Sequence, residues 1–293
     1  MQYLKPALTF AQKYDLLISR GLTIPDRAKA ISTFQHINYY RLSAYFPPFQ
    51  ATRDHFRAGV SFEQILYLYE FDALLRSIIF EALAKIEISI RTAMAYILAH
   101  QYGPFGYTRE DNFHFRIPHT HIQHEQWMRK VKKSVQDSTE SFIQHYFQKY
   151  TSSSDLPIWM VCEIISFGQI SQLFQGMKKS DKSQISRLYE LPPVVMSSWL
   201  HSIIYVRNLC AHHSRIWNRI LAITPMHYKQ APEWERITTN KIFSIFLIIK
   251  KLLHPKSDWI TWRDKFQDLI DSCKQIDKKS MGFPEDWKER LMR

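Results

Sequence analysis

The stretch SFEQILYLYEFDALLRSIIFEALAKIEISIRTAMAYILAH, residues 61–100, decides the fold and contains neither glycine nor proline. Its apolar residues recur at spacings of three, four or seven, which is the period of an α-helix. They are Ile65, Leu68, Leu75, Ile79, Leu83, Ile86, Ile90 and Ile97. Ser61 and Gln64 have the spacing of a capping box, and Gly103 ends the run. The segment predicts one long helix, or two nearly collinear ones.

Four charged residues within this stretch, Asp72, Arg76, Glu87 and Arg91, fall within an arc of roughly 100° on a helix of 3.6 residues per turn. They form two pairs with the acid four residues before the base, a spacing that supports ion pairing. Two interpretations stay open. The four residues form either an exposed salt-bridged stripe or a polar seam beneath a functional site.

The rest of the chain also has helical periodicity, with few glycines and no internal repeat. Further helices are expected at 9–20, 26–35, 124–150, 157–178, 194–215, 237–253 and 259–275, and residues 103–123 are expected to be irregular. Residues 1–60 are predicted to form a small helical N-terminal lobe, and residues 61–293 the main helical domain. Short connections between helices favour an all-α antiparallel bundle.

The charge balance indicates a polyanionic partner. Lys and Arg number 39 against 27 acidic residues, a formal charge of +12, and 14% of residues are aromatic. Such a field attracts nucleic acid first and anionic membrane second, and aromatic rings can stack on unpaired bases. A basic protein without such a partner is the alternative.

The cysteines and the apolar segments indicate the compartment. Cys162, Cys210 and Cys273 are too far apart for a zinc motif and odd in number, so reduced thiols are expected. Residues 1–13 lack the apolar core of a signal peptide, and lysines interrupt the apolar segment 237–253, so no membrane span is expected. The sequence predicts a cytoplasmic protein.

The sequence gives little support for metal binding, nucleotide binding or a cysteine nucleophile. His114, His119, His121 and His124 lie close together, but no cysteine or carboxylate completes a metal-binding spacing, and a solvated or RNA-facing loop is expected instead. There is no glycine-rich phosphate loop. Cys210 and His212 would face apart on a helix, which disfavours a cysteine nucleophile. No metal and no cofactor is predicted.

The segment from Val206 to Arg219 carries the candidate chemistry, since it contains three arginines, two histidines and two asparagines directly after an apolar helical run. Cleavage of RNA without a metal needs a group of near-neutral pKa to move protons, for which imidazole is best suited. It also needs fixed positive charge at the phosphate, which a guanidinium supplies. His212 and Arg207 can fill these roles, and Asn208 can orient the phosphate.

Spacing alone is weak support, because Arg109–His114 and Arg116–His121 have it too. Residues five apart lie about 140° apart around an ideal helix, so Arg207 and His212 do not share a face. They converge only if the helix is distorted, or if two copies of the chain meet across a symmetric interface. A solvated polar helix end without catalytic function is the alternative.

The segments 207–213 and 215–219 resemble the signature of the Abi-like (AbiD/AbiF) abortive-infection family, which belongs to the HEPN superfamily with its R-x(4–6)-H ribonuclease motif. The likeness extends along the chain in consistent order. Its other blocks are Tyr39–Leu42 with Tyr45 and Pro48; Tyr69–Asp72 with Leu75 and Arg76; Ile86–Ile88 with Arg91 and Thr92; Pro157–Trp159 with Glu163 and Ser166–Gly168; and Met281–Pro284 with Trp287.

The resemblance implies an all-α HEPN core, a homodimer that brings two motifs together, and cleavage that leaves a 2′,3′-cyclic phosphate. Arg207 and His212 would be catalytic, with Asn208 as the polar residue beside the arginine, and His213, Arg215 and Arg219 are candidates for binding RNA. Such proteins resemble toxins of antiphage or toxin–antitoxin systems, some of them held in check by a partner RNA.

Two functions of other classes remain open, namely a non-catalytic protein that binds a small regulatory RNA and a protein–protein adaptor in a defence complex. The sequence assigns no chemical step to the polar residues outside the motif. These are Asp72, Arg76, Glu87, Arg91 and Glu163.

Overall fold

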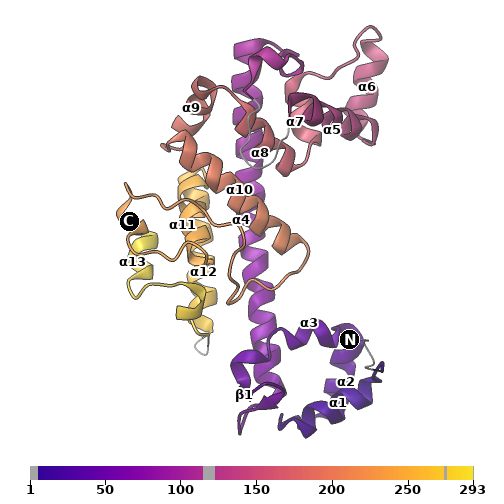
Figure 1. Ribbon diagram of the computed structural model, residues 1–293, viewed down its shortest axis with the longest axis vertical. Helices are drawn as coiled ribbons and strands as arrows, with labels where there is room; N and C mark the ends of the chain where they lie inside the picture. Colours follow the sequence, from indigo (N-terminus) through magenta and orange to yellow (C-terminus); the bar gives the residue numbers. More distant parts are fainter. Residues whose placement is uncertain (1–5, 115–122, 274–275, 293) are drawn as a thin grey trace. The chain divides into compact units, whose positions relative to one another are not determined.

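A computed structural model describes residues 6–114, 123–273 and 276–292. In these residues the fold is all-α, as predicted, with one two-stranded hairpin (Figure 1). The α-helices are α1 (Phe10–Ser19), α2 (Arg27–His36), α3 (Tyr39–Ser43), α4 (Phe62–Tyr102), α5 (His124–Gln136), α6 (Ser141–Lys149), α7 (Ile158–Ile164), α8 (Phe167–Gly176), α9 (Lys179–Arg187), α10 (Pro193–Ala211), α11 (Phe243–Leu252), α12 (Lys256–Ser272) and α13 (Trp287–Met292). Strands β1 (Gln50–Thr52) and β2 (His55–Phe56) pair antiparallel. Single 3₁₀ turns lie at Pro47–Phe49, Gly106–Thr108, Glu110–Asn112, Pro232–Trp234 and Lys279–Met281.

The chain divides into two compact units. The first comprises Met1–Ser77 and Asp268–Ile276, and the second comprises Ile78–Gln267 and Asp277–Arg293. Helices α4 and α12 each contribute residues to both units. The predicted domain boundary after residue 60 stays a prediction.

Of the two alternatives predicted for the glycine-free stretch, one long helix or two nearly collinear ones, the structure has the single helix α4. The predicted capping box is present, because the Gln64 amide donates to Ser61 Oγ at 3.3 Å and the Ser61 amide donates to Gln64 Oε1 at 3.0 Å. The apolar stripe is buried along the whole helix, with Ile65, Ile79 and Ile90 fully inaccessible. Burial of this stripe holds the helix in the core of each unit.

In the first unit, α4 buries a polar cluster. The Tyr45 hydroxyl donates to Asp72 Oδ2 at 2.5 Å, and the Arg76 guanidinium forms an ion pair with the same carboxylate. Burial and the neighbouring carboxylate raise the pKa of Tyr45 well above its usual value. Asp72 is inaccessible and Arg76 nearly so, so the interpretation of this pair as an exposed stripe is wrong.

In the second unit, α10 packs against α8, α9 and α11. Its buried Trp199 stacks on Trp234, with ring centroids 5.0 Å apart, and donates from its indole nitrogen to the Met226 carbonyl at 2.9 Å. A tight core of this kind limits how far the helix can move. It therefore fixes the backbone of α10, from which its polar side chains project.

Two predicted helices are each divided in the structure. The helix expected at 124–150 is α5 and α6, separated at Asp137–Glu140, where the Ser138 hydroxyl accepts from the Glu140 amide at 3.3 Å. The helix expected at 157–178 is α7 and α8, because Ser166 forms a capping box with Gln169 that starts a new helix. Short polar side chains offer the backbone these alternatives to a continuous helix.

Other boundaries also differ. Helix α10 ends at Ala211 rather than near 215, and α11 starts at Phe243 rather than near 237. Helices α9 and α13 and the β-hairpin were not expected. His124 is not part of a solvated loop, since it is buried at the start of α5, stacks on Phe113 and bonds through Nε2 to the Tyr107 carbonyl at 2.8 Å. His119 and His121 lie outside the described residues.

Candidate active site

Helix α10 has an apolar face in the core and a polar face in solvent. Met196, Trp199, Leu200, Ile203 and Val206 are inaccessible. His201, Asn208 and His212 are all exposed, and their spacings of seven and four place them on one face. The helix therefore presents a row of polar groups that ends at its C-terminus.

The last turn of α10 closes with a Schellman-type arrangement. The amides of His212, His213 and Ser214 donate to carbonyls of the final turn at 2.9–3.0 Å. His213 adopts a left-handed backbone with φ +53°, the conformation that glycine usually occupies at this position. Helix α10 thus stops directly after the candidate residues.

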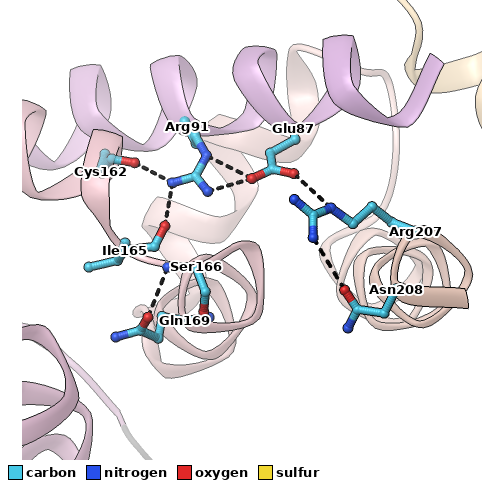
Figure 2. A network of polar contacts seen from close by, with 8 residues as sticks. All are labelled: Glu87, Arg91, Cys162, Ile165, Ser166, Gln169, Arg207 and Asn208. Atoms are coloured by element: carbon cyan, nitrogen blue, oxygen red, sulfur yellow. Dashed lines mark hydrogen bonds and ion pairs between the residues drawn. The ribbon is translucent and has the colours of Figure 1, made fainter. Parts of the chain in front are cut away.

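Arg207 lies against α4 in a half-buried position, with 34% of its side chain exposed. Its Nε lies 3.5 Å from Glu87 Oε2, and its Nη1 lies 3.5 Å from Asn208 Oδ1 (Figure 2). The guanidinium carbon lies 5.6 Å from the centroid of the Phe80 ring, within range of a cation–π contact. These contacts leave the guanidinium partly accessible to a ligand.

Arg207 and His212 do not share a face within one chain. The helical hydrogen bond from the His212 amide to the Asn208 carbonyl is intact at 3.0 Å, and α10 is regular as far as Ala211. The two residues therefore keep the separation of about 140° that an undistorted helix imposes. Of the two routes to convergence, a distorted helix is not present between these residues.

Glu87 and Arg91 form a buried network beside Arg207, which corrects their interpretation as an exposed stripe. Arg91 donates from Nε and Nη2 to Glu87 Oε1, the first at 3.1 Å (Figure 2). Only 12% of the Glu87 side chain and 11% of the Arg91 side chain are exposed. The seam interpretation fits this pair, because the opposite oxygen of Glu87 faces Arg207.

The segment after α10 is anchored in the core. Ile216 and Trp217 are buried, which holds the neighbouring basic residues near the helix end. Arg215 and Arg219 are half-buried, and Arg219 Nη1 donates to the Arg215 carbonyl at 3.2 Å. His213 is exposed. The role of these three residues in binding RNA stays a prediction.

Glu163 is separate from this network. It is exposed and lines an open hollow of about 570 Å³ together with Asp137, Glu140 and Phe142. The carboxylates give the hollow a negative character, which does not favour a polyanion. Within residues 6–114, 123–273 and 276–292, no cluster of three or more potential ligands could hold a metal ion.

The site is thus the end of a core helix in an all-helical protein, where a guanidinium, a carboxamide and an imidazole lie at the surface. Residues 32–218 match the family model described as Abi-like protein. The chain belongs to the Abi-like protein family, and this membership suggests a function in abortive infection. Comparisons with curated proteins and with solved structures gave no match. In the described residues, no helix is both long and apolar enough to cross a membrane.

Proposed function

We propose that the protein is a HEPN-type, metal-independent endoribonuclease that acts as a toxin in abortive infection. The observation that carries this proposal is the end of α10. Arg207 is held there by Glu87 and Phe80, and Asn208 and His212 are exposed one and five residues after it. Family membership and the formal charge of +12 support the same function.

In the proposed reaction, the 2′-oxygen of RNA forms a bond to the adjacent phosphorus while the bond to the 5′-oxygen breaks. The imidazole of His212 from one copy accepts the proton from the 2′-hydroxyl and passes a proton on to the leaving 5′-oxygen. Arg207 stabilises the charge on the phosphorane, and Asn208 positions the phosphate. The products are a 2′,3′-cyclic phosphate and a 5′-hydroxyl.

This reaction uses a second copy of the chain, because one undistorted helix does not bring Arg207 and His212 together. We propose a symmetric homodimer in which each copy contributes its motif to a shared centre. A non-coding RNA that acts as antitoxin or regulator is a further proposed partner, and the cytoplasm is the proposed location.

The test is cleavage of single-stranded RNA by purified protein with and without a chelator. Replacing His212 by alanine is expected to lower the cleavage rate by at least about 100-fold. Its stability should stay unchanged, because His212 is exposed. His201→Ala is the matched control, because His201 is exposed on the same face of α10. This variant should cleave RNA at the wild-type rate.

Two results would redirect the assignment. Tight, salt-dependent RNA binding without cleavage by the wild type would support the non-catalytic RNA-binding function. Purification with a protein partner and without nucleic acid would support the adaptor. Cleavage by His212→Ala at the wild-type rate would overturn the proposed mechanism.

A further inference from the structure

We propose that Glu87 is a positioning residue for Arg207, and that Arg91 in turn fixes Glu87; this inference rests on the proposed ribonuclease function. The two carboxylate oxygens of Glu87 serve different arginines. Oε1 accepts from Arg91, at 3.1 Å from its Nε, whereas Oε2 lies 3.5 Å from Arg207 Nε (Figure 2). Two nitrogens of Arg91 donate to Oε1 and define the plane of the carboxylate, so Oε2 constrains the position of Arg207.

Arg91 is fixed to the backbone on the side away from Glu87. Its Nη1 donates to the Ile165 carbonyl at 2.7 Å and also to the Cys162 carbonyl (Figure 2). Cys162 belongs to the last turn of α7, where carbonyl groups lack a partner within the helix. Arg91 therefore replaces missing helical hydrogen bonds, and its position is set by the backbone at the break between α7 and α8.

The contacts of Arg207 leave two of its nitrogen atoms for a ligand. Glu87 Oε2 lies nearest to Nε, so Nη1 and Nη2 are the groups that can bind a phosphate bidentately. Asn208 Oδ1 lies 3.5 Å from Nη1, and the guanidinium carbon lies 5.6 Å from the centroid of the Phe80 ring. Together the three contacts favour the orientation seen for the guanidinium.

The charges indicate that Glu87 orients Arg207 and does not neutralise it. Glu87 contacts Arg91 through two nitrogens, one of them at 3.1 Å, and contacts Arg207 through one nitrogen at 3.5 Å. Because Arg91 already balances the carboxylate, the group of three carries one net positive charge. That charge lies on the most exposed member, Arg207, with 34% of its side chain accessible.

The test is steady-state cleavage kinetics of Glu87→Gln, which keeps the shape of the side chain and removes its charge. We expect kcat to fall on the order of 10- to 100-fold, the effect of misplacing a reacting group. KM should change less than about threefold, because phosphate contacts elsewhere contribute to RNA binding. Glu87→Asp keeps the charge and should restore part of the loss.

Asp72→Asn provides the matched control, because Asp72 and Arg76 form the same kind of buried i,i+4 pair on α4 but bond Tyr45 instead. It should lower the unfolding temperature and leave kcat unchanged. If Glu87 were only structural, Glu87→Gln would behave in the same way. The double variant Glu87→Gln/Arg207→Lys should be as active as Arg207→Lys alone. Both substitutions remove the same contact, that between Glu87 and Arg207 Nε.

The outcomes separate the two proposals. A wild type that binds RNA without cutting it contradicts the proposed function, and the positioning role falls with it. A wild type that cuts RNA, together with a folded Glu87→Gln variant whose kcat is within threefold of it, overturns the positioning role alone. If Glu87→Gln fails to fold, the same criteria apply to Glu87→Asp, whose kcat must then fall with KM nearly unchanged.

Discussion

His213 occupies a left-handed conformation, φ +53°, directly after α10. A side chain other than glycine costs roughly 1–2 kcal/mol in this conformation. We therefore expect His213→Gly to be more stable than His213→Ala by about 1 kcal/mol, after allowing for the greater freedom of glycine in the unfolded chain. Comparing the two variants removes any contribution from the imidazole itself.

Urea denaturation followed by circular dichroism measures this difference. The control is the same pair of substitutions at His201, which lies inside α10. There the order should reverse, with alanine more stable by about 0.5–1 kcal/mol. Equal stability of the two His213 variants would contradict the strain at the helix end.

Cys162 is expected to be inert in the folded protein. It is fully buried, and desolvation raises the pKa of its thiol to about 12. Since the thiolate is the reactive species, a fraction on the order of 10⁻⁴ is available at pH 8 even to a reagent that reaches it. Alkylation followed by peptide mass spectrometry should label Cys162 only after denaturation. Rapid labelling of native protein would show that the α7 region opens.

At the residue scale, the sequence identified the candidate groups but not their neighbours. Arg207, Asn208 and His212 stood out because a polar cluster follows an apolar helical run. The pair Glu87 and Arg91 was also visible as an i,i+4 pattern. Its contact with Arg207 was not, because side-chain contacts between helices distant in sequence leave no local pattern.

Among the elements, the break between α7 and α8 receives hydrogen bonds from one arginine of α4. Arg91 bonds two carbonyl groups there and holds Glu87 from the other side. Replacing it by methionine keeps much of the volume but leaves Glu87 and both carbonyls without this donor. We expect a loss of about 3 kcal/mol in the free energy of unfolding.

Arg129→Met is the matched control for Arg91→Met in chemical denaturation. Arg129 also has an acid four residues earlier, Glu125, but both side chains are well exposed, at 67% and 75%. Exposed pairs of this kind contribute little, so the change should stay within about 0.5 kcal/mol. Similar losses for the two variants would mean that the Arg91 network does not stabilise the break.

Element types were predictable where one periodic pattern ran without interruption, as in α4. The predicted helices at 124–150 and 157–178 were wrong in continuity, because the Ser138 hydroxyl accepts from the Glu140 amide in the turn and Ser166 forms a capping box. Neither serine breaks the apolar period. Whether one continuous helix or two shorter helices form depends on tertiary packing, which a single sequence does not reveal.

In the whole molecule, the family match and the compact units divide the chain differently. The match covers residues 32–218 and includes residues of both units, whereas α11, α12 and α13 lie beyond it. All five residues of the proposed network and motif lie inside the match, namely Glu87, Arg91, Arg207, Asn208 and His212. Helix α11, which packs on α10, supports the site from outside the matched region.

The proposed homodimer predicts that two inactive variants complement each other in a mixed dimer. Arg207→Ala and His212→Ala should each be inactive alone. A mixed dimer keeps the imidazole of one copy and the guanidinium of the other, so combining the variants after subunit exchange should restore measurable cleavage. About half of the dimers are mixed when equal amounts exchange at random. Mixing Arg207→Ala with the double variant is the control and should stay inactive, because no guanidinium remains. Absence of activity despite exchange observed by native mass spectrometry, or cleavage by a wild-type monomer, would contradict a centre shared between copies.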